Sequence, residues 1–156
     1  SRKRKGYPRY FLEWTLEEQL TYLSFPNAND LALALSSENE KEKALALLAM
    51  KYVQHIRSSY WDWFGDQQYF LSRLQDIFYI GFQETLSDDF EVIKKKLALP
   101  KDLNLPTDPI QSHKNPDHFD KKLSATGIEN LRKWYAKDIE FFEFCKSIAL
   151  KTNNHE

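Results

Sequence analysis

The sequence predicts a mostly α-helical chain with one or two short β-strands. Apolar residues recur three and four positions apart along most of its 156 residues, which is the pattern of helices with one buried face. The exception is residues 77–82, a short apolar run of β-branched and aromatic residues broken only by Gly81. Such a run predicts a strand that is covered on both faces, as in the parallel sheet of an α/β fold.

A covered strand needs hydrogen-bonded neighbours, and the sequence offers no second strand of this kind. We therefore expect residues 77–82 to belong to a sheet whose other strands lie outside the chain, with an exposed edge or with pairing to another copy. The alternative is a short buried segment that is not a strand. The small number of glycines, 4 in 156, favours the first interpretation. A complete doubly wound domain uses glycines in its phosphate loop and turns, and average proteins contain about 7%.

The composition restricts the class of protein. A hydrophobic content of 42% with 15% aromatic residues indicates a packed core and excludes disorder for most of the chain. The formal net charge of −1 gives no overall sign of a nucleic-acid or membrane partner, and no apolar run is long enough to span a bilayer. The one cysteine, Cys145, cannot form an internal disulfide and fits a reducing, cytoplasmic location.

Helix start and stop signals predict several short helices, which together form a single domain. Thr15 and Glu18 form a capping-box pattern, Asn27 or Asn29 is a second cap, and Ser124 is a third. The spacing predicts helices over residues 16–24, 30–35, 38–57, 66–74, 86–97 and 124–148, the last with a bend near Ala136. Residues 58–66 read as an aromatic loop, and residues 100–120, with four prolines, as a long loop.

Three stretches are candidates for binding, each with a plain structural alternative. Residues 1–10 hold five cations and no acid, which indicates either a frayed terminus or an arm that binds phosphate or sulfate. Trp61 lies in the aromatic loop, which either plugs the core or stacks on a flat ligand. Glu84 follows the expected strand, where it is a base, a hydrogen-bond anchor or a helix cap. His113 and His118 lack metal-ligand spacing, so no metal site is expected.

Glycine-rich nucleotide loops, zinc motifs and nucleophile elbows are absent from the sequence. Four pieces of the chain nevertheless resemble, in order, the bacterial sulfotransferases of the P-loop-like sulfotransferase superfamily. Residues 78–89 resemble that family's F-x-I-G-x-x-E-x-L-x-x-D strand-to-helix element, and residues 1–9 the stretch just after its R-D-P-x-x-R-x-x-S motif. Residues 113–116 resemble its H-x-N-P/S loop, and residues 123–138 its L-S…L-x-x-W/Y-Y-x-x-D closing helices.

The resemblance implies the C-terminal half of an α/β fold that transfers a sulfuryl group from PAPS (3′-phosphoadenosine 5′-phosphosulfate) to an acceptor hydroxyl or amine, in a small molecule or a glycan. The family's P-x-x-G-[ST]-[TS] phosphosulfate loop is not in this sequence, so the chain alone is expected to be inactive. The implied cofactor-binding residues are Ser1, Arg2, Lys3, Arg4 and Arg9. The expected acceptor-binding residues are Glu84, His113 and Lys114, which lie in the resembling pieces, and Trp61 of the aromatic loop.

Two other interpretations remain open from the sequence. The chain is also consistent with a helical protein-interaction module that has no chemistry. A nucleic-acid-binding arm at residues 1–10 is the third interpretation, and it fits less well because the rest of the chain is not basic.

Overall fold

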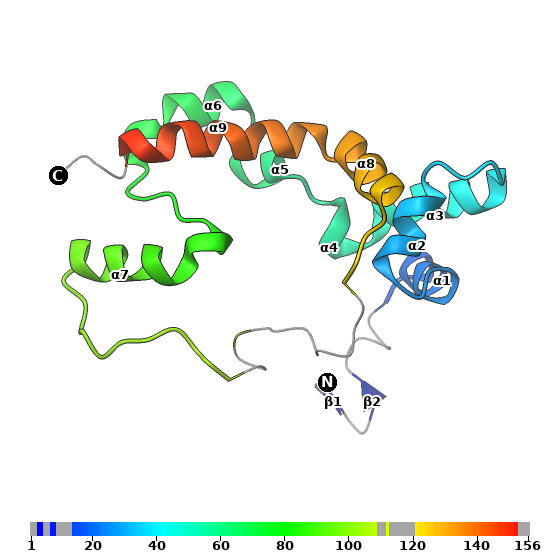
Figure 1. Ribbon diagram of the computed structural model, residues 1–156, viewed down its shortest axis with the longest axis horizontal. Coiled ribbons are helices and arrows are strands. Elements are labelled where there is room, and N and C mark those ends of the chain that lie inside the picture. The colour runs from blue at the N-terminus through cyan, green and yellow to red at the C-terminus, as the bar shows by residue number, and fades with distance from the viewer. Residues whose placement is uncertain (1–2, 5–6, 9–13, 109–111, 113–120, 153–156) are drawn as a thin grey trace. The chain divides into compact units, whose positions relative to one another are not determined.

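The structure is a computed structural model that describes residues 3–4, 7–8, 14–108, 112 and 121–152, with side chains described for 14–108, 112 and 121–149. This part of the chain is mostly helical, as the sequence predicts (Figure 1). Two strands of two residues each, β1 (Lys3–Arg4) and β2 (Tyr7–Pro8), pair antiparallel. None of the described helices is long and apolar enough to cross a membrane.

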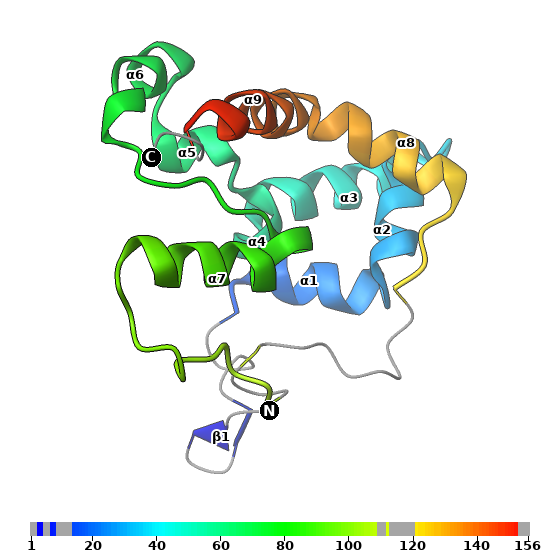
Figure 2. The ribbon, with the colours of Figure 1, turned by 60° about the vertical axis from the view of Figure 1, so that its left-hand side comes forward.

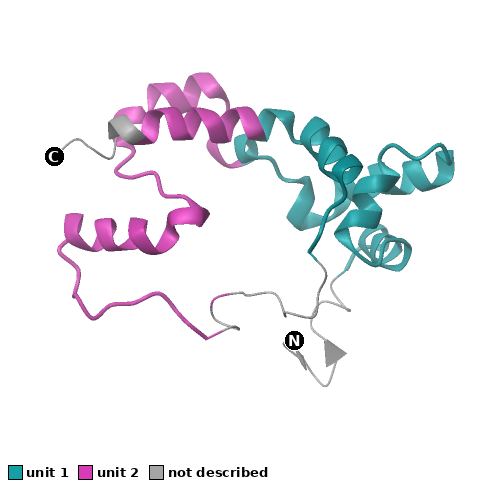
Figure 3. Cartoon of the chain, in the orientation of Figure 1, with its two compact units in different colours: residues 1–62, 120–138 teal, residues 63–119, 139–156 magenta. Residues whose placement is uncertain are grey.

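The chain forms two compact units, shown in different colours in Figure 3. Unit 1 consists of residues 1–62 and 120–138, and unit 2 of residues 63–119 and 139–156. The helices of unit 1 are α1 (Leu16–Ser24), α2 (Ala28–Ala34), α3 (Glu40–Tyr52), α4 (Gln54–Arg57) and α8 (Ala125–Trp134). The helices of unit 2 are α6 (Gln67–Ser72), η2 (Leu74–Asp76), η3 (Gln83–Thr85) and α7 (Leu86–Lys96). Helices α5 (Tyr60–Phe64) and α9 (Ala136–Thr152) each have residues in both units.

Unit 1 is built on two helix pairs, α1 with α3 and α2 with α8 (Figure 2). Its core is a cluster of Phe25, Ala34 and Ala46, against which the partly buried Leu31, Leu35 and Leu45 pack. The predicted capping box is confirmed, since Thr15 and Glu18 bind each other's backbone N–H groups at 3.2 and 3.1 Å.

The close approach of α2 and α8 depends on Gly127. A Cβ atom at this position would lie only 3.1 Å from Asn29 Oδ1 and 3.3 Å from the Ala32 Cβ. Across the same contact the Asn130 side chain donates to the Ala32 carbonyl at 2.9 Å and to Ser36 Oγ at 2.8 Å. The contact between α2 and α8 therefore depends on the small Gly127 and on the hydrogen bonds of the Asn130 amide, in addition to the usual packing of side-chain ridges into grooves.

The helix predicted over residues 38–57 is interrupted at Val53. Val53 has extended dihedral angles, φ −70° and ψ 117°, and separates α3 from α4. The N–H of Gln54, at the start of α4, donates to Glu18 Oε1 at 3.2 Å. Glu18 therefore caps two helices, and a contact 36 residues away compensates for the break in the helix.

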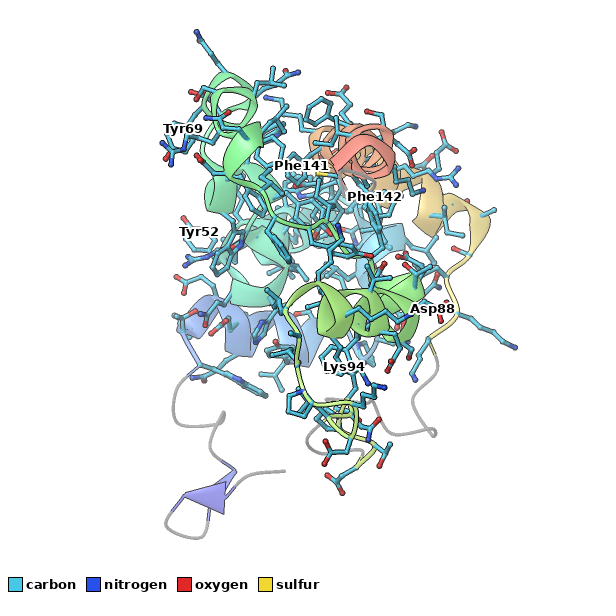
Figure 4. The ribbon with its side chains drawn as sticks, turned by 90° about the vertical axis from the view of Figure 1, so that its left-hand side faces the viewer. Tyr52, Tyr69, Asp88, Lys94, Phe141 and Phe142 are labelled. Carbon is cyan, nitrogen blue, oxygen red and sulfur yellow. The ribbon has the colours of Figure 1, made fainter. Side chains whose placement is uncertain are left out.

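Unit 2 is centred on phenylalanine rings rather than on a sheet. Phe70 and Phe141 are 6% and 5% exposed, and their ring centroids lie 5.3 Å apart in an edge-to-face contact. Phe64 stacks on Phe141 at 5.2 Å, and Phe144 contacts Phe70 at 5.9 Å. Figure 4 shows Phe141 among other side chains and Tyr69 at the periphery.

Residues 77–82, for which the sequence predicts a strand with partners outside the chain, are not assigned as a strand in the described part of the chain. The backbone is extended at both ends of the segment, with φ −83° and ψ 111° at Ile77 and φ −123° and ψ 148° at Phe82. It forms no ladder with any described residue. The Phe82 N–H, which a ladder would use, donates to the Asp89 side chain instead. The sheet of an α/β sulfotransferase fold is accordingly not visible among the described residues.

Candidate functional site

Residues 79–89 form a turn organised by one carboxylate, and we call it the Asp89 turn. Asp89 Oδ1 accepts a hydrogen bond from the Tyr79 hydroxyl at 2.7 Å. Asp89 Oδ2 accepts from the Phe82 N–H at 2.8 Å and from the Thr85 hydroxyl at 2.7 Å. Three donors from seven residues of chain thus converge on the first turn of α7, which fixes the segment that leads into this helix.

The Asp89 turn explains why the Thr85 side chain does not cap α7. Thr85 occupies the N-cap position, but its side chain makes no capping bond to the helix N–H groups. Its hydroxyl is directed to Asp89 instead. The acidic residues Asp88 and Asp89 in the first turn of α7 still match the helix dipole.

Glu84 lies in η3, between the two residues whose groups bind Asp89 Oδ2. Its side chain is exposed, and it makes no hydrogen bond or ion pair with another residue of the described part of the chain. The structure therefore presents a carboxylate to solvent on a turn whose backbone is fixed on both sides. Such a group can accept a hydrogen bond from a hydroxyl or amine, or attract a cation.

The hydrogen bonds of the Asp89 turn shift two pKa values in opposite directions. Burial raises the pKa of the Asp89 carboxyl, but the bonds from Phe82, Tyr79 and Thr85 outweigh it and lower the pKa below its usual value. Burial and then the bond to Asp89 raise the pKa of the Tyr79 hydroxyl to about 12. Both shifts favour the same protonation states, a neutral Tyr79 hydrogen-bonded to an ionised Asp89.

The titration of Tyr79 tests this pairing. Because its folded pKa is raised, the contribution of Tyr79 to stability is complete below about pH 10 and is lost as the pH rises through about 12. We expect the ¹³Cζ resonance of Tyr79, assigned with Tyr79→Phe, to titrate near that higher value. In Asp89→Asn the midpoint should fall only part of the way to about 10, because burial remains. An unchanged midpoint in Asp89→Asn would contradict the pairing.

Lys94, in the last turn of α7, is a buried charge. Its side chain is 6% exposed, and its ammonium group binds Glu91 Oε1 at 2.6 Å and the carbonyls of Lys101 and Leu103 at 3.3 and 3.0 Å. Figure 4 shows Lys94 beside the segment that follows α7. Lys94 therefore fixes the beginning of the long loop. Its spacing of four from Phe90, on the apolar stripe of α7, was the signal for burial.

The aromatic loop expected at residues 58–66 contains the short helix α5. Trp61 is partly buried in this helix, whereas Trp63 is 78% exposed. For stacking on a ligand, Trp63 is thus the more accessible indole. The two tryptophans lie two residues apart in an apparent loop, so their spacing does not tell which one is exposed.

Of the other predicted site residues, Trp61 belongs to unit 1 and Glu84 to unit 2. Lys3 and Arg4 form β1, and their side chains are not described. Five predicted residues lie outside the described residues: Ser1, Arg2, Arg9, His113 and Lys114.

Unit 1 also has a shallow polar hollow of about 280 Å³ at the start of α8, lined by Asn27, Asn29, Lys122, Leu123 and Ser124. Its polar groups are engaged locally: Asn29 Oδ1 accepts the Ser124 N–H at 2.7 Å, and Ser124 Oγ accepts the Gly127 N–H at 3.1 Å. No group of three metal-ligating side chains occurs among the described residues. Comparisons with protein-family models, curated proteins and solved structures find no match for this chain.

Proposed function

We propose that this chain is a sulfotransferase-like region that takes part in transfer of a sulfuryl group from PAPS to an acceptor hydroxyl or amine. The observation that carries the proposal is the Asp89 turn. The residues that resemble the strand-to-helix element of bacterial sulfotransferases include Glu84 and Asp89. In the structure Asp89 organises the turn, and Glu84 is an exposed carboxylate on it.

The second described piece of the resemblance supports the same proposal. Ser124 accepts the Gly127 N–H and caps α8, at the L-S position of the closing helices. Tyr135 and Asp138, at the Y-x-x-D positions, bind the main chain at Ile56 and Tyr60, 79 and 78 residues away. The residues of the resemblance thus make specific long-range contacts.

Sulfuryl transfer, like phosphoryl transfer, depends on positioning and on donors for charged oxygens. In the proposed arrangement, cations of residues 1–9 contact the 3′-phosphate of PAPS, and Glu84, His113, Lys114 and Trp61 contact the acceptor. The donors for the 5′-phosphosulfate come from a P-x-x-G-[ST]-[TS] loop, which this sequence does not contain. The chain alone is therefore expected to bind weakly and not to turn over.

A thermal-shift titration with PAP, the desulfated cofactor, tests the proposal. We expect saturable stabilisation in a longer version of the protein that includes a P-x-x-G-[ST]-[TS] turn, and a small shift or none in the 156-residue chain. Arg2→Ala with Arg4→Ala should reduce the shift, whereas the matched pair Lys95→Ala with Lys133→Ala, on α7 and α8, should not. Absence of a shift in the longer version would overturn the proposal.

A second candidate, a helical interaction module without chemistry, is favoured by one observation. Leu16, Leu20 and Leu23 follow one face of α1 and are 67%, 40% and 83% exposed. This candidate predicts no response to PAP in either version of the protein.

A further inference from the structure

The connection between α4 and α5 is held by two side chains from the other end of the sequence. Asp138 Oδ1 accepts the N–H of Tyr60, the first residue of α5, at 2.6 Å. The Tyr135 hydroxyl donates to the carbonyl of Ile56, in α4, at 2.7 Å. All four residues belong to unit 1, and Asp138 and Tyr135 are both partly buried.

These two bonds compensate for weak local structure. Helix α4 has four residues and α5 has five, and the N-cap residue of α4, Val53, makes no side-chain capping bond. Helices this short are not stable by themselves. Within the segment, Asp62 Oδ2 accepts the Ser59 N–H at 2.7 Å, and Ser59 Oγ accepts the Asp62 N–H at 3.3 Å. Asp138 adds a long-range acceptor at the next N–H, so the orientation of α5 depends on a group that lies outside the segment.

We propose that Asp138 and Tyr135 are positioning residues for Trp61, which follows Tyr60 directly in α5. By fixing the carbonyl of Ile56 and the N–H of Tyr60, they set the direction of the turn that carries the indole. This inference rests on the proposed function, in which Trp61 contacts the acceptor. It extends that function by giving Tyr135 and Asp138 the role of holding Trp61 in its orientation before the acceptor binds. Neither residue contacts the reacting groups in this role.

The experiment uses the native chain labelled with 5-fluorotryptophan, whose four ¹⁹F resonances are assigned one by one with Trp→Phe variants. Asp138→Ala removes the acceptor for the Tyr60 N–H, so we expect the Trp61 resonance to shift and broaden while that of Trp14 stays in place. Asp138→Asn keeps an oxygen that can accept this N–H, and it should restore the parent Trp61 signal. Tyr135→Phe should cause a smaller shift, because only the bond to Ile56 is lost.

Glu129→Ala is the matched control, since it removes an exposed carboxylate of α8 that pairs with Lys133 at 2.7 Å and should leave Trp61 unchanged. A Trp61 resonance that is unaffected by Asp138→Ala, or that moves equally in Asp138→Asn, would overturn the inference. Loss of dispersion at all four tryptophans in Asp138→Ala would mean general unfolding, and would also overturn a specific positioning role. The readout needs no cofactor, so a failure of the PAP titration and a failure of this inference are distinguishable.

Discussion

Phe141→Ala is expected to lower the free energy of unfolding of the chain by about 3–5 kcal/mol, the usual cost of truncating a buried phenylalanine. Phe141 is 5% exposed and contacts the rings of Phe64 and Phe70 with centroids 5.2 and 5.3 Å away. Its removal leaves a cavity between rings that α5 and α6 hold in place. Urea denaturation followed by far-UV circular dichroism would measure the loss.

Phe78→Ala is the matched control for this change. Phe78 is 53% exposed in the extended segment before the Asp89 turn, and the same truncation there should cost less than about 1 kcal/mol. Equal losses for the two variants would show that the phenylalanine cluster is not the core of unit 2.

Asp89→Ala is the second change with a large expected effect. It removes the acceptor for the Tyr79 hydroxyl, the Phe82 N–H and the Thr85 hydroxyl. Bonds to a charged acceptor contribute about 1.5–3 kcal/mol each. Two of these bonds are partly buried and the Thr85 bond is exposed, so we expect a total loss of about 3 kcal/mol. Amide hydrogen exchange at Phe82 should become faster by about tenfold or more, as the turn opens locally.

The neighbouring Asp88 provides the control. It is exposed in the same turn of α7, and Asp88→Ala should remove only its interaction with the helix dipole, about 0.5 kcal/mol.

The loss from Asp89→Ala should also diminish at low pH. The folded pKa of Asp89 is lowered, so its stabilisation is present above about pH 4 and disappears as the pH falls through the folded pKa. A loss of the same size at every pH would contradict the assigned role of its ionised form.

The helix boundaries were largely predictable because their causes are local. The capping box of Thr15 and Glu18, the cap of Ser124 and the bend near Ala136 all appear where short-range pattern places them. The interruption at Val53 was not predictable, because the N–H of Gln54 is satisfied by a carboxylate 36 residues earlier in the chain.

In the candidate site, too, some features follow from the sequence pattern and others depend on the packed structure. Sequence pattern drew attention to Glu84 because of its place after an apolar run, but it did not reveal the hydrogen-bond partner of that run within the chain. In the structure the Phe82 N–H binds a side chain rather than a neighbouring strand, and Lys94 is buried against two carbonyls that no spacing rule links to it. Burial and hydrogen-bond partners depend on which groups meet in space, and this is a property of the packed chain.

The sequence by itself determined that the chain is mostly helical and where most of its helices begin. These properties follow from periodicity and capping, which act over a few residues. Only the tertiary structure decided that residues 77–82 are extended without a ladder, that Asp89 organises the turn carrying Glu84, and that Asp138 and Tyr135 hold the start of α5. The physical reason is that a hydrogen bond across ten or eighty residues forms only when packing has brought its donor and acceptor together.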